Sequence, residues 1–356
     1  MPCNIDYYRG EFLDCQHFFC KFFNFMAAAL FSFGNIWGII LLLLCLYIGK
    51  FTKLKVIILN ISRRLTGIML AIGGSIFWGG SGVAAQFLLQ ERGMTADFLT
   101  AIRTLTAGLL LLLVDRFIYG NNITDIWRDR DSRNRLLFFG VFGMMAVQYT
   151  YFAAIAYSNA PTGTIIQYLM PVVILIWMAI SEKKLPRLSQ ALCALMAILG
   201  TALLVTHGSL TTLSISERAL FWGILSAFAA ACYTITPRWL LMRWPSAQVV
   251  GWAMLIGGIA ISLLCTPLSV PATLDSDAIF SLAYICILGT AVAFWAYVTS
   301  TKYILPQEAS ILNATEPLAS IVFSVLLLNV VFQLPEIAGT VLIIIPVLYI
   351  TTRKNK

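Results

Sequence analysis

One carboxylate stands in the middle of a long apolar stretch near the C-terminal end of the sequence. Glu316 directly precedes Pro317, and the surrounding residues 309–331 are almost wholly apolar and numerous enough to cross a bilayer. A carboxylate at the centre of the hydrocarbon core costs about 3 kcal/mol or more unless it has a partner. We therefore expect either that Glu316 faces a cavity and binds a cationic group or a proton, or that it joins two helices as a hydrogen-bonded carboxyl.

Two amides stand at matching distances before two prolines. Gln167 lies one helical turn before Pro171, and Asn313 lies one turn before Pro317. Amides bind polar solutes without the cost of a buried charge, although they also join transmembrane helices. Each proline removes a backbone donor, so Pro171 and Pro317 are candidate hinges.

The other candidate binding residues are polar or aromatic. Gln148 and Tyr151 are three residues apart and therefore share one face of a helix. Packing or a position at the membrane interface is the alternative for the aromatic residues. The remaining candidates that we expect to line a substrate cavity are all aromatic: Trp78, Tyr233, Trp295 and Tyr297.

Groups that would support catalysis are scarce. The sequence has two histidines, of which His207 falls in a polar connection and His17 lies in a short C-x-H-x-x-C stretch with Cys15 and Cys20. One His and two Cys make a weak metal signal, and we expect an exposed tail there. No G-x-x-x-x-G-K-[ST] motif occurs, so we predict no ATP-driven pump. We predict no enzyme, no catalytic residue, no metal site and no cofactor.

Two further features of the apolar segments are expected to be structural. Arg103 lies about five residues inside an apolar stretch, and we expect it to extend to the outer surface, with a buried carboxylate as the alternative partner. Ala71, Ser75 and Gly79 recur every four residues, which predicts a face where another helix packs closely.

Composition indicates which elements must position these side chains. The chain has 356 residues, of which 60% are hydrophobic and 11% are charged, and its mean hydropathy is +0.86. Runs of roughly twenty apolar residues predict an all-α polytopic membrane protein and not a β-barrel. We expect one possible extra N-terminal helix over 22–48 and ten spans over 68–89, 98–119, 136–157, 162–180, 189–206, 219–241, 247–268, 278–304, 307–330 and 337–350.

The positive charge follows the predicted topology. Most of the 24 Lys and Arg residues fall in alternate connections, whereas the opposite connections hold only Arg92 and Arg218. Because basic residues are retained on the cytoplasmic side, both ends of the ten-span core are expected in the cytoplasm. The net charge of +8 is thus a topology signal and does not indicate nucleic-acid binding. We expect a multi-pass protein of the plasma membrane with a cytoplasmic C-terminus.

The ten spans form an internal repeat. A shift of 146 residues places Gly143 on Gly289, Tyr151 on Tyr297, and GTIIQYLMP (163–171) on ASILNATEP (309–317). Five is an odd number, so a copied five-helix unit lies inverted in the membrane. We expect a first repeat over 66–207 and a second over 208–352. Residues 1–65 form an N-terminal extension that is either an additional membrane helix or sequence upstream of the true start.

These residues, taken in order, resemble the drug/metabolite transporter superfamily, and its EamA-type branch most closely. The resemblance covers roughly residues 66–352 and implies ten helices around a central cavity, lined mainly by helices 1, 3, 4, 6, 8 and 9. At one point the sequence departs from it, because 328–330 (LNV) stand where a second Glu equivalent to Glu182 is usual. The stretches that carry it are IFWGGSG (76–82), Arg103, YFAAIAYSNAPTGTIIQYLMPV (151–172), Glu182 and the Glu316-Pro317 pair.

The combined expectation is a secondary transporter that works by alternating access around a cavity at the membrane midplane. Small organic metabolites such as amino acids are the expected substrates, and export is the expected direction. A non-transporting scaffold or partner subunit is the alternative, and an intramembrane enzyme acting on lipids lacks the necessary residues. The expected partners are the solute, the lipid bilayer and protons as a candidate coupling ion. Substrate identity, coupling ion and oligomeric state stay open.

Overall fold

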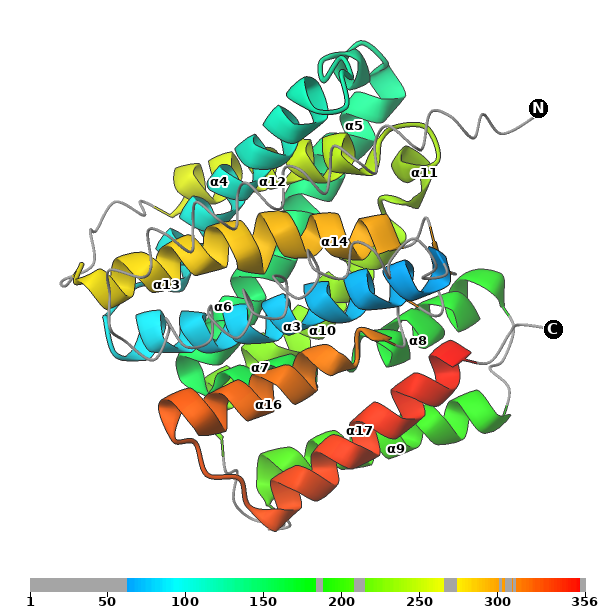
Figure 1. Cartoon of the computed structure of the whole chain (residues 1–356). Helices are drawn as coiled ribbons and strands as arrows, with labels where there is room; N and C mark the ends of the chain where they lie inside the picture. Colours follow the sequence, from blue (N-terminus) through cyan, green and yellow to red (C-terminus); the bar gives the residue numbers. More distant parts are fainter. Residues whose placement is uncertain are drawn as a thin grey trace.

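A computed structural model describes residues 63–183, 188–207, 215–265, 274–300, 303–304, 309 and 312–352. The expected N-terminal helix and the stretch from Cys15 to Cys20 lie outside the described residues. Every regular element in the described ranges is helical, as expected (Figure 1). The all-α class therefore holds for the part of the chain that the structure describes.

The first half of the described chain begins with two long helices and ends with a shorter one, and the helices between them are interrupted. The elements are α3 (Arg63–Gln90), α4 (Ala96–Phe117), η3 (Asp125–Trp127), α5 (Arg130–Phe138), the π-helical η4 (Phe139–Met145), α6 (Ala146–Tyr157), α7 (Ala160–Gln167), α8 (Met170–Glu182) and α9 (Leu188–Thr206).

The second half repeats this order. Its elements are α10 (Glu217–Ile235), α11 (Arg238–Leu241), α12 (Ser246–Leu264), α13 (Ser276–Cys286), the π-helical η5 (Ile287–Val292), α14 (Ala293–Ser300), α16 (Thr315–Leu328) and α17 (Leu334–Thr352). Polar caps start several helices, because a side-chain oxygen of Thr95, Asp129, Asn159, Ser216 or Asp275 accepts a hydrogen bond from the first turn.

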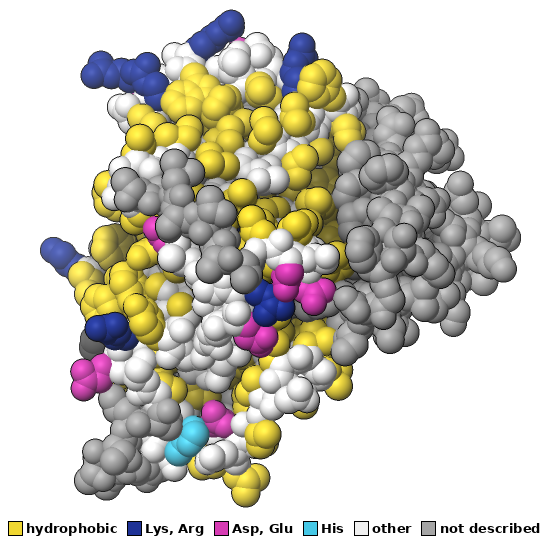
Figure 2. Space-filling view, turned by 90° about the vertical axis from the view of Figure 1, so that its left-hand side faces the viewer, with side chains coloured by type: hydrophobic (Ala, Val, Ile, Leu, Met, Phe, Trp, Pro, Cys, Tyr) yellow, Lys and Arg dark blue, Asp and Glu magenta, His cyan; other side chains and the backbone are white. Residues whose placement is uncertain are grey.

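Seven helical stretches in the described residues are long and apolar enough to cross a membrane. Three shorter apolar helices, Ala191–Leu204, Thr315–Leu328 and Leu334–Pro346, lie where the fifth, ninth and tenth spans were expected. Large hydrophobic side chains such as Trp177, Phe228 and Leu326 are exposed. On the side of the molecule shown in Figure 2, hydrophobic side chains cover much of the described surface and charged groups are few. A lipid environment accounts for this surface.

Two predicted spans differ from the structure in a way that matters for function. The span expected over 162–180 is interrupted at Tyr168–Leu169, between α7 and α8, and a matching interruption at Asn313–Ala314 precedes α16. Pro171 and Pro317 lie within the first turns of α8 and α16. In the first turn of a helix a backbone N–H has no acceptor within the helix, so a proline there removes no hydrogen bond. The helix breaks therefore lie before the two prolines and are not caused by a hydrogen bond that the prolines remove.

Local backbone features recur at the spacing of the sequence repeat. The π-helical segments η4 and η5 overlap when the chain is shifted by 146 residues. At the same shift Lys183 overlies Asn329, and each ends its helix in the left-handed conformation, with φ of 52° and 51° respectively. The LNV stretch over 328–330 has no glutamate, but its helix ends in the same backbone conformation as the equivalent helix of the first half.

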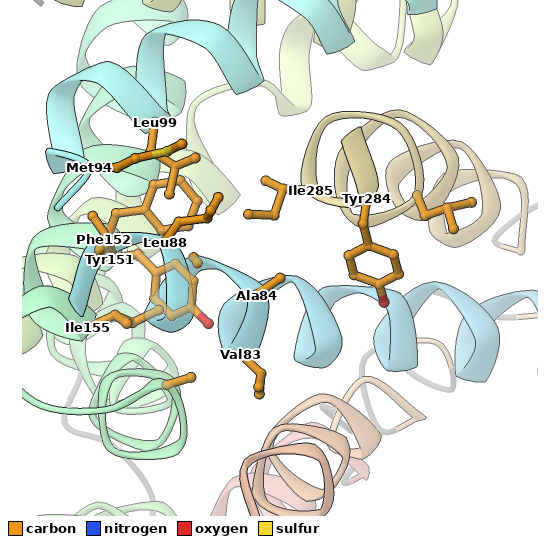
Figure 3. Close-up of a cluster of buried hydrophobic side chains, with 14 of the residues drawn as sticks. Val83, Ala84, Leu88, Met94, Leu99, Tyr151, Phe152, Ile155, Tyr284 and Ile285 are labelled. Atoms are coloured by element: carbon orange, nitrogen blue, oxygen red, sulfur yellow. The ribbon is translucent and has the colours of Figure 1, made fainter. Parts of the chain in front are cut away.

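Helix α3 occupies the centre of the helix arrangement. It packs against α16 and against α13 and α14, while α4 packs on α12, α6 on α10, and α9 on α17 (Figure 1). Around its second half, buried side chains of α3, α4, α6 and α13 form a core that includes Leu88, Leu99, Phe152 and Ile285 (Figure 3). Each of the pairs α4–α12 and α9–α17 joins equivalent helices of the two halves.

Candidate functional site

The close-packing face predicted on α3 meets the start of α16. Ala71 and Ser75 are fully buried, and a Cβ atom added to Gly79 would lie 2.6 Å from the main-chain oxygen of Glu316. The Ser75 hydroxyl lies 2.8 Å from the Asn313 Oδ1 atom. The face is therefore confirmed as a packing surface, and it also brings a hydroxyl to the break before α16.

Four side chains form a hydrogen-bonded cluster at this place, which we call the polar node: Ser75, Tyr168, Asn313 and Glu316. The Tyr168 hydroxyl donates to the Asn313 main-chain oxygen at 2.6 Å and accepts from the Asn313 amide nitrogen at 2.9 Å. The same amide nitrogen donates to Glu316 Oε2 at 3.3 Å. Both helix breaks thus contribute to one node, which α3 closes from the side.

The Glu316 carboxyl has one engaged and one available oxygen. Its contacts from Asn313 Nδ2 (3.3 Å) and the Tyr168 hydroxyl (3.5 Å) both go to Oε2. Within the described ranges, Oε1 accepts no hydrogen bond, although the residue is half-buried. A partly desolvated carboxylate with a free oxygen is suited to bind an ammonium group or a proton. The contacts of Oε2 fit the expected hydrogen-bonded carboxyl, whereas binding of a cationic group or a proton by Glu316 stays a prediction.

Arg103 does not reach the surface, so the expectation that it extends to the outer surface was wrong. It is buried, and its guanidinium donates to the Thr290 hydroxyl at 2.5 Å and to the Gly289 carbonyl at 3.2 Å, with Phe152 4.9 Å away. Both acceptors belong to η5, where the π-helical backbone changes which carbonyls are bonded within the helix. Within the described part of the chain, the structure shows no ion pair between Arg103 and Glu316.

A row of aromatic side chains, here called the aromatic row, extends from α14 to η4. Trp78 contacts Tyr297 at 5.1 Å and Phe294 at 4.8 Å between ring centroids. Phe294 contacts Tyr233 at 6.2 Å, and Tyr233 stacks on Phe139 at 5.8 Å. Three predicted binding residues are thereby brought together. Tyr297 and Leu312, the residue before Asn313, both pack against the buried cluster that includes Ala71, so the aromatic row approaches the polar node.

Gln148 and Tyr151 are buried side by side on α6, as their spacing predicted. The Tyr151 hydroxyl lies 2.9 Å from the Thr164 hydroxyl, and in Figure 3 it points toward α3. The Gln148 amide has the Met144 sulfur at 3.9 Å as a weak acceptor. Thr164 lies one helical turn before Tyr168, whose backbone N–H donates to the Thr164 carbonyl, and this places Tyr151 near the polar node.

Besides Gln148 and Tyr151, two predicted residues belong to neither the polar node nor the aromatic row. Trp295 donates from its indole nitrogen to the Tyr119 hydroxyl at 3.1 Å, which ties α14 to the end of α4. Gln167 ends α7 half-buried and outside the hydrogen bonds of the polar node. Gln167 is equivalent to Asn313 in the sequence repeat, yet the residue that forms hydrogen bonds with Asn313 is its neighbour Tyr168.

Sequence analysis missed Tyr168, and it saw Ser75 only as a packing residue. Tyr168 stands in the stretch QYLMP between an amide and a proline, but the repeat pairs it with Ala314, which carries no polar group. Ser75 was recognised from the spacing of small residues on α3. The available signal was position in the sequence: Tyr168 directly follows Gln167, and Ser75 lies one helical turn before Trp78.

Two contacts between charged or ionisable side chains join the two halves of the chain at helix ends, away from the polar node. Arg92 binds Asp275 with Nη2–Oδ2 at 2.9 Å, and this hydrogen-bonded guanidinium lowers the pKa of the Asp275 carboxyl. His207, in the polar connection after α9, has its Nε2 atom 3.4 Å from Glu336 Oε1 in the first turn of α17, a contact that is ionic when the imidazole is protonated. Both contacts connect residues of the first half with residues of the second.

Three comparisons place this chain among known proteins. The model of the EamA-like transporter family matches it twice, over residues 65–206 and 217–352. A protein of Salmonella typhimurium described as the uncharacterized inner membrane transporter YicL is 39% identical over 285 residues, which cover 80% of this chain and 95% of that protein. A protein of known crystal structure aligns over 82% of this chain and 98% of its own chain, with a TM-score of 0.56 and 18% sequence identity. This similarity supports the fold alone.

Proposed function

Because this chain belongs to the EamA-like transporter family, we propose that it is a secondary transporter that exports small organic metabolites, such as amino acids, across the plasma membrane. The two family matches and the apolar helices identify a multi-pass membrane transporter. The relative described as an inner membrane transporter supports the plasma membrane as its location. The solute and the direction of transport are the parts that we propose.

The proposed mechanism is alternating access between two inverted five-helix halves, 66–207 and 208–352. In transporters of this architecture the solute binds near the midplane, where interrupted helices of the two halves meet. The observation that carries the proposal is the polar node, because it joins the break at Tyr168 to the break at Asn313. The repeated π-helical segments and left-handed helix ends support the duplication. The excess of basic residues in alternate connections supports a cytoplasmic C-terminus.

The charged groups fit a solute that carries both an amine and an acid. Oε1 of Glu316 is the proposed partner of a cationic group, or of a proton that exchanges with it. Arg103 has one guanidinium nitrogen, Nη1, that is buried and makes no hydrogen bond in the described ranges. That nitrogen is the proposed donor to a carboxylate, and the aromatic row is proposed to contact the apolar part of the solute. Gln148, Gln167 and Trp295 remain proposed contacts of the open cavity.

A two-step experiment tests this function. The purified full chain is first screened for amino acids, amines and other metabolites that raise its unfolding temperature, since a ligand of the folded state raises apparent stability. The best solute is then loaded into proteoliposomes and its flux is measured. Flux above that of empty liposomes is the expected result. If no solute in the screen is carried, the scaffold or partner-subunit role becomes the better account.

A further inference from the structure

A cleft lies apart from the polar node, at the water-facing ends of two membrane spans. It has a volume of about 670 Å³ and is formed by α5 along its length, the end of α10, and α11. Arg135 and Phe138 line one wall, and Ile235, Arg238 and Trp239 line the other. The proposed transport mechanism assigns nothing to this cleft.

Arginine side chains are held in place at the cleft by one indole ring. The guanidinium of Arg135 lies 4.7 Å from the centre of the Trp239 ring, and that of Arg243 lies 4.0 Å from it. Stacking fixes the plane of a guanidinium but leaves its edge N–H groups available, which suits bidentate binding of phosphate. Among the described residues, no carboxylate forms an ion pair with Arg135, Arg238 or Arg243.

The charge balance of the lining favours an anion. Arg135 and Arg238 are opposed by one carboxylate, that of Asp131. Asp131 and the neighbouring Asn134 supply oxygen atoms that accept hydrogen bonds from hydroxyl groups. The cleft therefore combines a cationic part with acceptors for a polar group next to the anion.

Exposed apolar side chains continue from the cleft along the lipid-facing surface. Phe138, Met242 and Phe142, one turn along the same helix, are all at least half exposed. The rings of Phe138 and Phe142 lie 5.0 Å apart and present one apolar surface. In Figure 2, Lys and Arg side chains gather at the upper edge, the end at which α5 lies in Figure 1. A free anion gains nothing from contact with apolar side chains, whereas the acyl chain of a lipid packs against them.

We propose that this cleft binds the headgroup of an anionic phospholipid, with Arg135 and Arg238 on the phosphate. Asp131 and Asn134 accept hydrogen bonds from headgroup hydroxyls, and Phe138 and Phe142 lie along the upper part of an acyl chain. The bound lipid joins α5 to α11 and so stabilises the packing of the third and sixth spans. This site is independent of the transported solute.

The test titrates the purified full chain in detergent with short-chain phosphatidylglycerol and measures the unfolding temperature. Phosphatidylcholine of equal chain length and free glycerol phosphate are titrated in parallel. Phosphatidylglycerol is expected to stabilise the protein, and the other two are not. Replacing both cleft arginines, as Arg135→Gln with Arg238→Gln, is expected to weaken phosphatidylglycerol binding by roughly tenfold or more.

A charge-matched control separates the cleft from general attraction to anionic lipid. Arg128→Gln with Arg133→Gln removes two basic groups at the same end of the molecule but outside the cleft, and it is expected to leave binding within about twofold. Equal losses in both double variants, or equal stabilisation by free glycerol phosphate, would overturn the proposal. If the cleft double variant does not fold, Arg238→Gln alone is expected to weaken binding roughly fivefold. Unchanged binding in that single variant would also overturn the proposal.

Discussion

The Tyr168 hydroxyl donates to the main-chain oxygen of Asn313 at 2.6 Å and accepts a hydrogen bond from the Asn313 side chain at 2.9 Å. Each residue lies in the interruption of a helix, and the two interruptions belong to different halves of the chain. A carbonyl released by a helix break needs a donor, and in a membrane span water is not at hand to supply it. The Asn313 carbonyl accepts the Glu316 N–H at 2.9 Å, and Tyr168 adds a second donor from the other half of the chain, which holds Glu316 in a defined position.

Tyr168→Phe is expected to lower the free energy of unfolding by about 0.5–1.5 kcal/mol, because it removes the hydrogen bonds between Tyr168 and Asn313, whose carbonyl still accepts the Glu316 N–H. Transport should fall as well, since the position of Glu316 depends on the same contacts. Denaturant unfolding in micelles measures the first effect. Tyr157→Phe, at an exposed tyrosine that ends α6, is the control and should change little. Equal stability in the two variants would show that the Tyr168 contact is not needed.

The two repeat-related amides are expected to behave differently. Asn313→Leu removes bonds to Ser75, Tyr168 and Glu316 and should lower the free energy of unfolding by about 1–3 kcal/mol. Gln167→Met changes an amide outside the polar node and should alter that free energy by less than about 0.5 kcal/mol. A larger loss at Gln167 than at Asn313 would contradict the arrangement of the polar node.

Gly79→Ala tests the close approach of α3 to α16. The added Cβ would lie 2.6 Å from the Glu316 carbonyl and 2.9 Å from Ala319 Cβ, so the helices must separate. Overpacking of this kind costs about 1–3 kcal/mol. Gly73→Ala, on the same helix with no atom within 4 Å of the added Cβ, is the matched control. It should be neutral or slightly stabilising, because alanine favours a helix over glycine.

Asp275 gives a prediction about pH. Its pKa is lowered in the folded state by the hydrogen bond from Arg92, so its contribution to stability is present above the unfolded pKa and is lost as pH falls through the folded pKa. The pair should therefore stay intact between about pH 5 and pH 8. Asp275→Asn keeps a good N-cap for α13. Unfolding temperatures of the two proteins should run parallel in that window and differ in acid sensitivity below about pH 4.

Divergence of the two unfolding curves near neutral pH would show that the Asp275 carboxyl titrates there, contrary to this assignment. The exposed position of the ion pair limits the size of the effect, because solvent and salt screen it. Any pH dependence of transport near neutrality should therefore persist in the Asp275→Asn variant.

Much of the architecture was predictable from composition and spacing. The runs of apolar residues identified an all-helical membrane protein, and the small-residue spacing on α3 identified a packing face. Asn313 and Glu316 were selected because polar groups are costly in lipid, and the structure places them together. Trp78 and Tyr233 were selected as aromatic residues that could line a cavity, and Tyr297 as the repeat partner of Tyr151, and all three lie in the aromatic row.

The parts that could not be predicted depend on backbone geometry. The prolines suggested kinks at Pro171 and Pro317, but the chain breaks earlier, and this brings Tyr168 rather than Gln167 to Asn313. Arg103 was expected at the surface because it lies about five residues inside an apolar stretch. Its acceptors, Gly289 and Thr290, lie 186 and 187 residues away in a π-helical segment. No local sequence pattern predicts a π-helix, so the contacts of Arg103 with Gly289 and Thr290 could not be predicted from the sequence.

The most direct test of the central claim compares solute flux in proteoliposomes for the unchanged protein, Glu316→Gln and Glu217→Gln. Glu217 is an exposed carboxylate in the first turn of α10 and serves as the control. If Glu316 binds the solute or a coupled proton at the polar node, Glu316→Gln should reduce flux roughly tenfold or more and weaken its pH dependence, whereas Glu217→Gln should change neither. Flux through Glu316→Gln at the unchanged rate and with the unchanged pH profile would contradict the account.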